Sequence, residues 1–314
     1  MSNLTQYANS VTAVTVVPKS GKSGGAVTVY YNGSTSLPSA AGAYTVTFDV
    51  AEVDGWKAAT GLAGGKLAII LPGQTLVDNL DEATAYLSAA DGGESEENAV
   101  YFLVNIDLNS TAGGASGWQQ LLDAIADADK FITLDLSLCA MTGTEFDPVS
   151  SFSTGKDKVI SLTLPVVAKS ITGENNDSTF KNFDSLKTAS GAYVTTIGTL
   201  AFYKCSTLTE AYFPLAESIG GGAFWDCSSL TEANFPLAES IGRYTFIGCS
   251  SLIEASFPLV ESIDYYAFDN CSSLIEANFP LAESIDDGAF RVCSSLTEAS
   301  MIKVKLFPKE YFFF

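Results

Sequence analysis

The stretch that decides the fold reads CSSLTEANFPLAESIG and occupies residues 227–242. Close copies begin at residues 205, 249 and 271, and the first half recurs from residue 293, so a unit of 22 residues repeats almost letter for letter. A weaker, earlier copy is visible between residues 162 and 186. A fixed period of this length is the signature of a solenoid, whose coils bury their apolar side chains only by stacking.

One repeat predicts the course of its own coil. Leu230, Ala233 and Phe235 follow the L-x-x-L-x-L spacing of leucine-rich repeats, which places a short strand near residues 231–235. Each coil should hydrogen-bond its neighbours in a parallel sheet. The side chains expected to point inward on the return path are Leu237, Ile241, Phe246 and Cys249.

The repeats resemble the leucine-rich repeats of Bacteroides-surface-protein-A-like (BspA-like) surface proteins. That family has an Ile-Gly-x-x-Ala-Phe-x-x-Cys-x-x-Leu run and then a strand ending in proline. The residues that carry it here are Ile219, Gly220, Ala223, Phe224, Cys227, Leu230 and Pro236. The likeness is strong over about residues 194–300 and weaker over 131–193. Departures are Asp264 and Asp286 at the glycine position and Thr245 at the alanine position. The resemblance implies a cell-surface or secreted, adhesin-like protein that binds host or microbial proteins, and it brings no catalytic residues.

The residues before the repeats predict further modules. Short runs at 11–17, 26–31, 43–50 and 66–71 are typical of strands, and turn residues lie between several of them. The segments around Tyr30–Gly33 and Ala41–Val46 resemble bacterial immunoglobulin-like modules. Between residues 78 and 160, strand patterns alternate with two helical patterns. We expect Asp81 to cap the first helix and Ser116 the second.

The expected fold class is mainly β with some α: an immunoglobulin-like β-sandwich followed by a leucine-rich-repeat solenoid with an α/β cap at its N-terminal end. The predicted boundaries are a disordered start at 1–10, the sandwich at 11–71, the cap at 72–160, the repeats at 161–300, and a C-terminal tail or cap at 301–314.

The composition excludes several classes of function. A formal net charge of −20 disfavours nucleic-acid binding, and the absence of histidine removes histidine-dependent catalysis and every histidine-containing metal site. The glycine-lysine pairs lack the spacing of a phosphate loop. We therefore expect no enzyme activity, cofactor or metal. The chain shows no run of 18 apolar residues and no signal-peptide pattern at its start.

Two kinds of exposed residue are candidates for binding a partner. Strand alternation turns one glutamate column outward, where it is either a solvated face or a footprint for a basic partner or for divalent cations; it consists of Glu210, Glu232, Glu254, Glu276 and Glu298. Aromatic residues occupy positions that vary between copies, either as a contact surface or through surface drift; they are Tyr212, Trp225, Tyr244, Tyr265 and Tyr266.

The column of cysteines has a simpler interpretation. Cys205, Cys227, Cys249, Cys271 and Cys293 recur every 22 residues, so their side chains point the same way and cannot pair evenly. We expect free, buried thiols that react slowly.

The leading functional hypothesis is protein binding at a bacterial surface, to a matrix or plasma protein of a host or to another microbe. A spacer or assembly subunit, self-associating through the solenoid end, is the alternative. A surface hydrolase is a third, with no motif in its favour.

Overall fold

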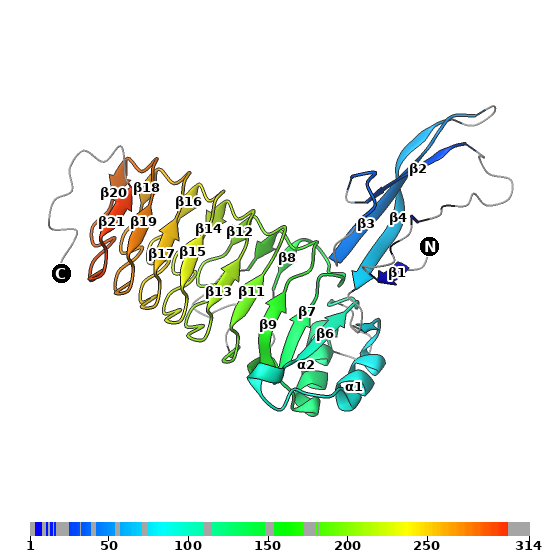
Figure 1. Ribbon diagram of the computed structural model, residues 1–314, viewed down its shortest axis with the longest axis horizontal. Helices are drawn as coiled ribbons and strands as arrows, with labels where there is room; N and C mark the ends of the chain where they lie inside the picture. The colour runs from blue at the N-terminus through cyan, green and yellow to red at the C-terminus, as the bar shows by residue number, and fades with distance from the viewer. Residues whose placement is uncertain are drawn as a thin grey trace. The chain divides into compact units, whose positions relative to one another are not determined.

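The computed structural model describes most of the chain, which divides into two compact units, Met1–Leu76 and Val77–Phe314 (Figure 1). The described residues are 4–7, 11, 13–14, 16, 25–31, 33–38, 42–53, 57–70, 75–109, 115–147, 154–172, 180 and 182–300. The expected C-terminal tail or cap at 301–314 lies outside them.

The described residues of the first unit form a four-stranded sheet. Its strands are β1 (Leu4–Tyr7), β2 (Val27–Tyr31), β3 (Gly42–Val50) and β4 (Ala59–Ile70), in the order β1-β4-β3-β2. β1 runs parallel to β4, and the other pairs are antiparallel. Val46, Leu67 and Ile69 form its buried core with Val14 and Tyr31.

Two expectations for this unit are wrong. Residues 1–10 are not a disordered start throughout, because Leu4–Tyr7 pairs with β4. The described residues of the run 11–17 form no strand: the backbone N–H of Val14 donates instead to the Tyr31 hydroxyl, at 2.8 Å. The described part of this unit holds a single sheet, so the immunoglobulin-like sandwich stays a prediction.

The second unit begins with an α/β segment. β5 (Leu76–Val77) lies at the sheet edge, and α1 (Leu80–Ala89) packs against α2 (Gly117–Ala128). Ser116 caps α2 as expected, accepting from the N–H of Gln119 at 3.1 Å. The cap of α1 is Asn79, not Asp81, which already lies inside the helix. Two short 3-10 turns are η1 (Glu96–Asn98) and η2 (Lys156–Lys158).

Most coils of the solenoid then supply two short strands (Figure 1). The first strands are β6 (Val100–Val104), β7 (Ile132–Asp135), β9 (Val159–Thr163), β11 (Thr188–Ser190), β13 (Glu210–Tyr212), β15 (Glu232–Asn234), β17 (Glu254–Ser256), β19 (Glu276–Asn278) and β21 (Glu298–Ser300). The second strands are β8 (Glu145–Phe146), β10 (Ser170–Ile171), β12 (Thr196–Ile197), β14 (Ser218–Ile219), β16 (Ser240–Ile241), β18 (Ser262–Ile263) and β20 (Ser284–Ile285).

The parallel sheets confirm the expected stacking, with one interruption on each side. First strands pair in the orders β13-β11-β9-β7-β6-β5 and β15-β17-β19-β21, and second strands in the orders β16-β14-β12-β10-β8 and β18-β20. Residues 22 apart face each other, as Glu232 faces Glu254. A third side is continuous: Phe202, Phe224, Phe246 and Phe268 each donate a backbone hydrogen bond to the next coil.

One core runs from Val77 to Cys293 and is built from repeated columns. The rings of Phe224, Phe246 and Phe268 stack with centroids 5.1–5.2 Å apart. The expectation that Leu237 points inward is wrong. Its side chain is 38% exposed, and the neighbouring Ala238 is buried instead. A tight turn, closed by the Ala238 N–H donating to the Phe235 carbonyl, brings the smaller side chain inward.

Between residues 200 and 292, each coil bends through two left-handed backbone positions. One column has positive φ at Leu200, Gly222, Tyr244, Tyr266 and Gly288. A second column, four residues on, has it at Asn182, Lys204, Asp226, Gly248, Asn270 and Val292. Glycine and asparagine adopt this conformation readily, whereas a β-branched residue is strained there. The geometry of the coil therefore imposes a cost wherever the sequence departs from these types.

Candidate functional site

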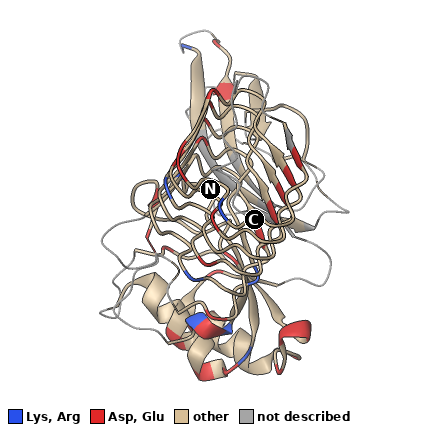
Figure 2. Cartoon of the chain, turned by 90° about the vertical axis from the view of Figure 1, so that its left-hand side faces the viewer, with Lys and Arg blue, Asp and Glu red and all other residues tan. Residues whose placement is uncertain are grey.

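The sheet face, meaning the outward side of β13, β15, β17, β19 and β21, carries the predicted glutamate column. Residues alternate along these strands, so the central alanines Ala233, Ala255 and Ala277 point into the coil. Glu210, Glu232, Glu254, Glu276 and Glu298 are all exposed, and consecutive members face each other wherever the strands pair. In Figure 2, acidic residues, coloured red, recur along the stacked strands.

A second acidic column lies just after these strands. Its members, Glu217, Glu239, Glu261 and Glu283, are exposed. Residues 201–300 contain fourteen acidic and three basic side chains. The sheet face is therefore a surface of negative charge whose field attracts cations and basic proteins and weakens as salt is added.

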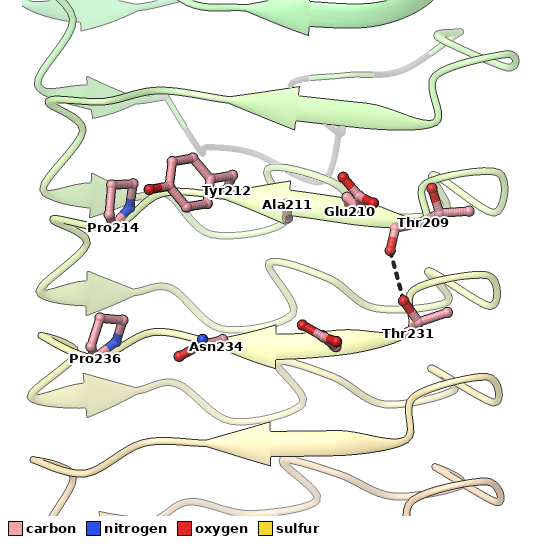
Figure 3. Close-up of a pocket in the computed structure, with 9 residues that line it drawn as sticks. Thr209, Glu210, Ala211, Tyr212, Pro214, Thr231, Asn234 and Pro236 are labelled. Carbon is pink, nitrogen blue, oxygen red and sulfur yellow. Dashed lines mark hydrogen bonds between the residues drawn. The ribbon is translucent and has the colours of Figure 1, made fainter.

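A hollow interrupts the sheet face between β13 and β15 (Figure 3). These two strands do not pair as their neighbours do; they are joined at one end, where Thr231 donates from its N–H and its hydroxyl to the Thr209 carbonyl, each at 3.3 Å. The hollow encloses about 470 Å³. Its lining residues are Thr209, Glu210, Ala211, Tyr212, Pro214, Thr231, Glu232, Asn234 and Pro236.

Tyr212 is the most exposed large side chain in this lining. It is 65% exposed and lies beside Glu210 on β13. The equivalent position in later coils holds Asn234, Ser256 and Asn278, which are polar. Among the described repeats, the pairing of first strands is interrupted only between β13 and β15. Tyr212, the exposed aromatic residue, lies at this interruption.

The other predicted aromatic residues lie together on a different side of the solenoid. Trp225 and Tyr244 have ring centroids 5.8 Å apart, and Tyr244 stacks on Tyr266 at 5.8 Å. Tyr265 lies across Tyr266 at 4.4 Å and is 38% exposed. These four residues, with Tyr203 at 5.4 Å from Trp225, form what we call the aromatic edge.

Cationic side chains lie against the aromatic edge. Lys204 lies over Tyr203, Arg243 over Tyr244 and Arg291 over Tyr266, at 4.9–5.9 Å from the ring centroids. Arg291 also donates twice to Asp269, at 2.6 and 3.0 Å. These are the three basic residues of 201–300, so the positive charge of that segment is gathered away from the sheet face.

Two of these tyrosines occupy strained backbone positions. Tyr244 and Tyr266 have φ of 62° and 52°, where neighbouring coils place Gly222 and Gly288. The left-handed region costs an ordinary residue roughly 1–2 kcal/mol. Ring stacking, worth about 0.5–1.5 kcal/mol, offsets much of this cost.

The cysteine column is buried and reduced. All six cysteines of the chain are free and buried. Cys227, Cys249, Cys271 and Cys293 each donate their thiol to the backbone carbonyl of a phenylalanine 25 residues earlier, at 3.1 Å. Burial raises the pKa of the Cys205 and Cys293 thiols to about 12. The column is thus not a set of nucleophiles at neutral pH.

Among the described residues, no cluster of three or more histidine, cysteine, aspartate or glutamate side chains is placed to bind a metal ion. No helix in that same part of the chain is long and apolar enough to cross a bilayer.

The structure brings the predicted site residues into two groups. The glutamate column and Tyr212 share the sheet face, whereas Trp225, Tyr244, Tyr265 and Tyr266 share the aromatic edge. Sequence reasoning missed the hollow, which depends on how two neighbouring coils pair. It also missed the pair formed by Asp269 and Arg291, although their spacing of one full repeat was a usable signal.

A model of a known protein family matches the repeats. Residues 174–297 match the BspA type leucine rich repeat region, in six copies. A leucine rich cell surface protein from Faecalibacterium prausnitzii A2-165 is 21% identical over 54% of this chain and 63% of its own, with a TM-score of 0.28. This chain therefore spans less than two thirds of that structure.

A leucine-rich repeat protein from Bacteroides ovatus ATCC 8483 is 16% identical over 75% of this chain and 77% of its own, with a TM-score of 0.22. No curated protein shows significant similarity to the chain. The family match over 174–297, together with the stacked coils, identifies this part of the chain as a BspA type leucine rich repeat region.

Proposed function

We propose that this protein is a cell-surface or secreted binding module that uses the rigid outer surface of its repeats to hold another protein. The contrast between buried and exposed positions carries the proposal. Buried columns repeat almost unchanged, whereas exposed positions hold Tyr212 in one coil and Asn234 or Ser256 in others. Stacking fixes the backbone, so varied side chains are displayed on a surface that needs little ordering on binding.

The chemistry of the two exposed groups supports a protein partner. Aromatic side chains and arginine are enriched where proteins bind each other, and both occur on the aromatic edge. The sheet face adds a field that steers a basic partner and sets its orientation. The described residues offer no arrangement that favours a reaction over binding: the carboxylates are exposed in a regular column and the thiols are buried.

Binding of the full chain to immobilised extracellular-matrix and plasma proteins, across a salt series, tests the proposal. We expect saturable binding to at least one of them. Replacing Trp225, Tyr244, Tyr265 and Tyr266 together by alanine tests the aromatic edge. Unchanged affinity in that variant would exclude this edge as the contact surface.

A matched variant tests the other surface. Glutamine at all five positions of the glutamate column removes charge and preserves shape, so a partner on the sheet face should lose affinity and salt dependence. If no protein of the panel binds, and the mass of the folded chain in solution rises with concentration, the binding proposal fails and an assembly subunit replaces it.

A further inference from the structure

We propose that the hollow between β13 and β15 receives a lysine or arginine side chain of the protein partner. The inference rests on the proposed function and makes it more specific. It concerns one coil boundary of the sheet face, with Glu210, Glu232 and Tyr212 as the contacting residues.

The first argument is shape. Paired parallel strands lie about 4.8 Å apart and leave no room for a side chain between them. β13 and β15 are linked near Thr209 and Thr231 only, and the space beyond that link opens to about 470 Å³. In Figure 3, the side chains of Glu210, Tyr212 and Asn234 border this space from the two strands.

The second argument is charge. Glu210 and Glu232 are both exposed carboxylates, and the hollow has no basic residue in its lining. Lys187, which lies just before β11 in the preceding coil, is paired with Glu96 at 2.7 Å. Lys204 and Arg243 lie over the rings of the aromatic edge instead. Among the described residues, therefore, no basic side chain is placed to occupy the hollow, and the two carboxylates are open to a cation from outside.

The third argument is the composition of the walls. Tyr212, Pro214 and Pro236 are apolar surfaces beside two acids. Lysine and arginine combine an aliphatic stem with a charged head, and an ammonium or guanidinium is attracted to the face of a tyrosine ring. A bare calcium ion fits less well, because it requires six to eight oxygen ligands around one point.

The remaining glutamates define the direction of the partner. Glu254, Glu276 and Glu298 continue the column away from the hollow, along coils that carry serine or asparagine where Tyr212 lies. They contribute long-range attraction without a pocket. A basic segment anchored at the hollow would therefore lie along the sheet face toward β21.

A blocked tetra-arginine peptide, Ac-Arg-Arg-Arg-Arg-NH2, is the probe, titrated into the full chain and followed by calorimetry. The test variant is Glu210→Gln with Glu232→Gln. Its matched control is Glu254→Gln with Glu276→Gln, which removes the same charge from the same column. We expect about a tenfold loss of affinity in the test variant and less than about a threefold loss in the control.

Tyrosine replacement separates the hollow from general attraction. Tyr212→Asn, which copies the next coil, should weaken peptide binding about three- to fivefold, and Tyr212→Phe should preserve it. Thermal melts establish that each variant folds. Equal losses in the two glutamine pairs, no effect of Tyr212→Asn, or no peptide binding by the native chain would overturn the proposal.

The two proposals fail separately. Suppose that a panel protein binds with an affinity that neither the Glu210→Gln, Glu232→Gln double variant nor Tyr212→Asn changes. The hollow is then not the binding site of that protein, but the chain is still a binding module. If the peptide binds as expected and no panel protein does, the hollow is a cation site and the proposed protein-binding role is the part that fails.

Discussion

Exchanging Val292 for asparagine should stabilise the last described coil. Val292 has φ of 59° in a column where other coils use Gly248 and Asn270. The left-handed region costs an ordinary residue roughly 1–2 kcal/mol, and more for a β-branched one, whereas asparagine tolerates it. The valine side chain is 42% exposed, so its removal forfeits only part of its burial energy.

The expected net gain is about 1 kcal/mol, which corresponds to roughly 2–4 °C in Tm for a unit of 150–250 residues. The reverse exchange, Asn270→Val, should cost about 1–2 kcal/mol. Ile275→Asn is the control, because it also replaces an exposed apolar residue but at a position without positive φ. Thermal melts of the full chain and hydrogen exchange of the last coil measure the effect. A lower Tm for Val292→Asn, or a gain equal to that of the control, would refute the reasoning.

Three further predictions concern the core and its charges. Phe246→Ala empties the middle of a ring stack and should cost about 3–5 kcal/mol, seen as a large fall in Tm; a loss under about 1 kcal/mol would contradict the stacked core. Burial and the nearby Asp264 raise the pKa of Asp286, so the folded state holds its proton more tightly and stability falls as pH rises through that window. Asp286→Asn should therefore raise Tm at pH 7, with the gain disappearing below about pH 4; a gain that persists at pH 3 would exclude this cause. The buried thiols should not react with a disulfide reagent at pH 8 until the chain unfolds, and stability should decline above about pH 8.5, where unfolded thiols ionise; rapid labelling of native protein would contradict both.

The period of the sequence was sufficient to predict the stacking and most of the core. Residues 22 apart must meet if the coils are equivalent, so Phe246 had to stack on Phe224 and Glu254 had to face Glu232. The same reasoning placed the glutamates outward, because strand residues alternate. These features depend on spacing alone.

Features that depend on local turn geometry could not be obtained this way. Leu237 and Ala238 are adjacent apolar residues, and only the tight turn after Phe235 decides which one is buried. Asn79 and Asp81 are both good caps, and the helix start distinguishes them. The two columns of left-handed backbone positions could not be predicted either. Glycine or asparagine at every position would have indicated them, but Leu200 and Val292 occupy two of these positions.

The candidate site likewise has one part that repeat spacing predicts and one part that it does not. The glutamate column was predicted residue by residue, but its hollow was not, because the sequence of coil 205–226 hardly differs from that of its neighbours. Tyr212 is the one difference in the strand that the sequence displays, and by itself it predicts a variable aromatic position but no hollow. The missing strand pairing between β13 and β15 depends on how two coils pack against each other, which the sequence of one coil does not reveal.

Because the same thiol-to-carbonyl hydrogen bond joins successive coils, the solenoid can change its length only by whole coils. Each cysteine of the column bonds to a carbonyl one coil back, so every boundary between coils has the same complementary surfaces. Removing residues 249–270 would place Cys271 directly after Gly248, opposite the carbonyl of Phe224, with the ring stack unbroken. Unequal recombination within the coding sequence can therefore add or delete whole coils without a folding defect at the join, and the reach of the displayed surface is open to rapid evolutionary change.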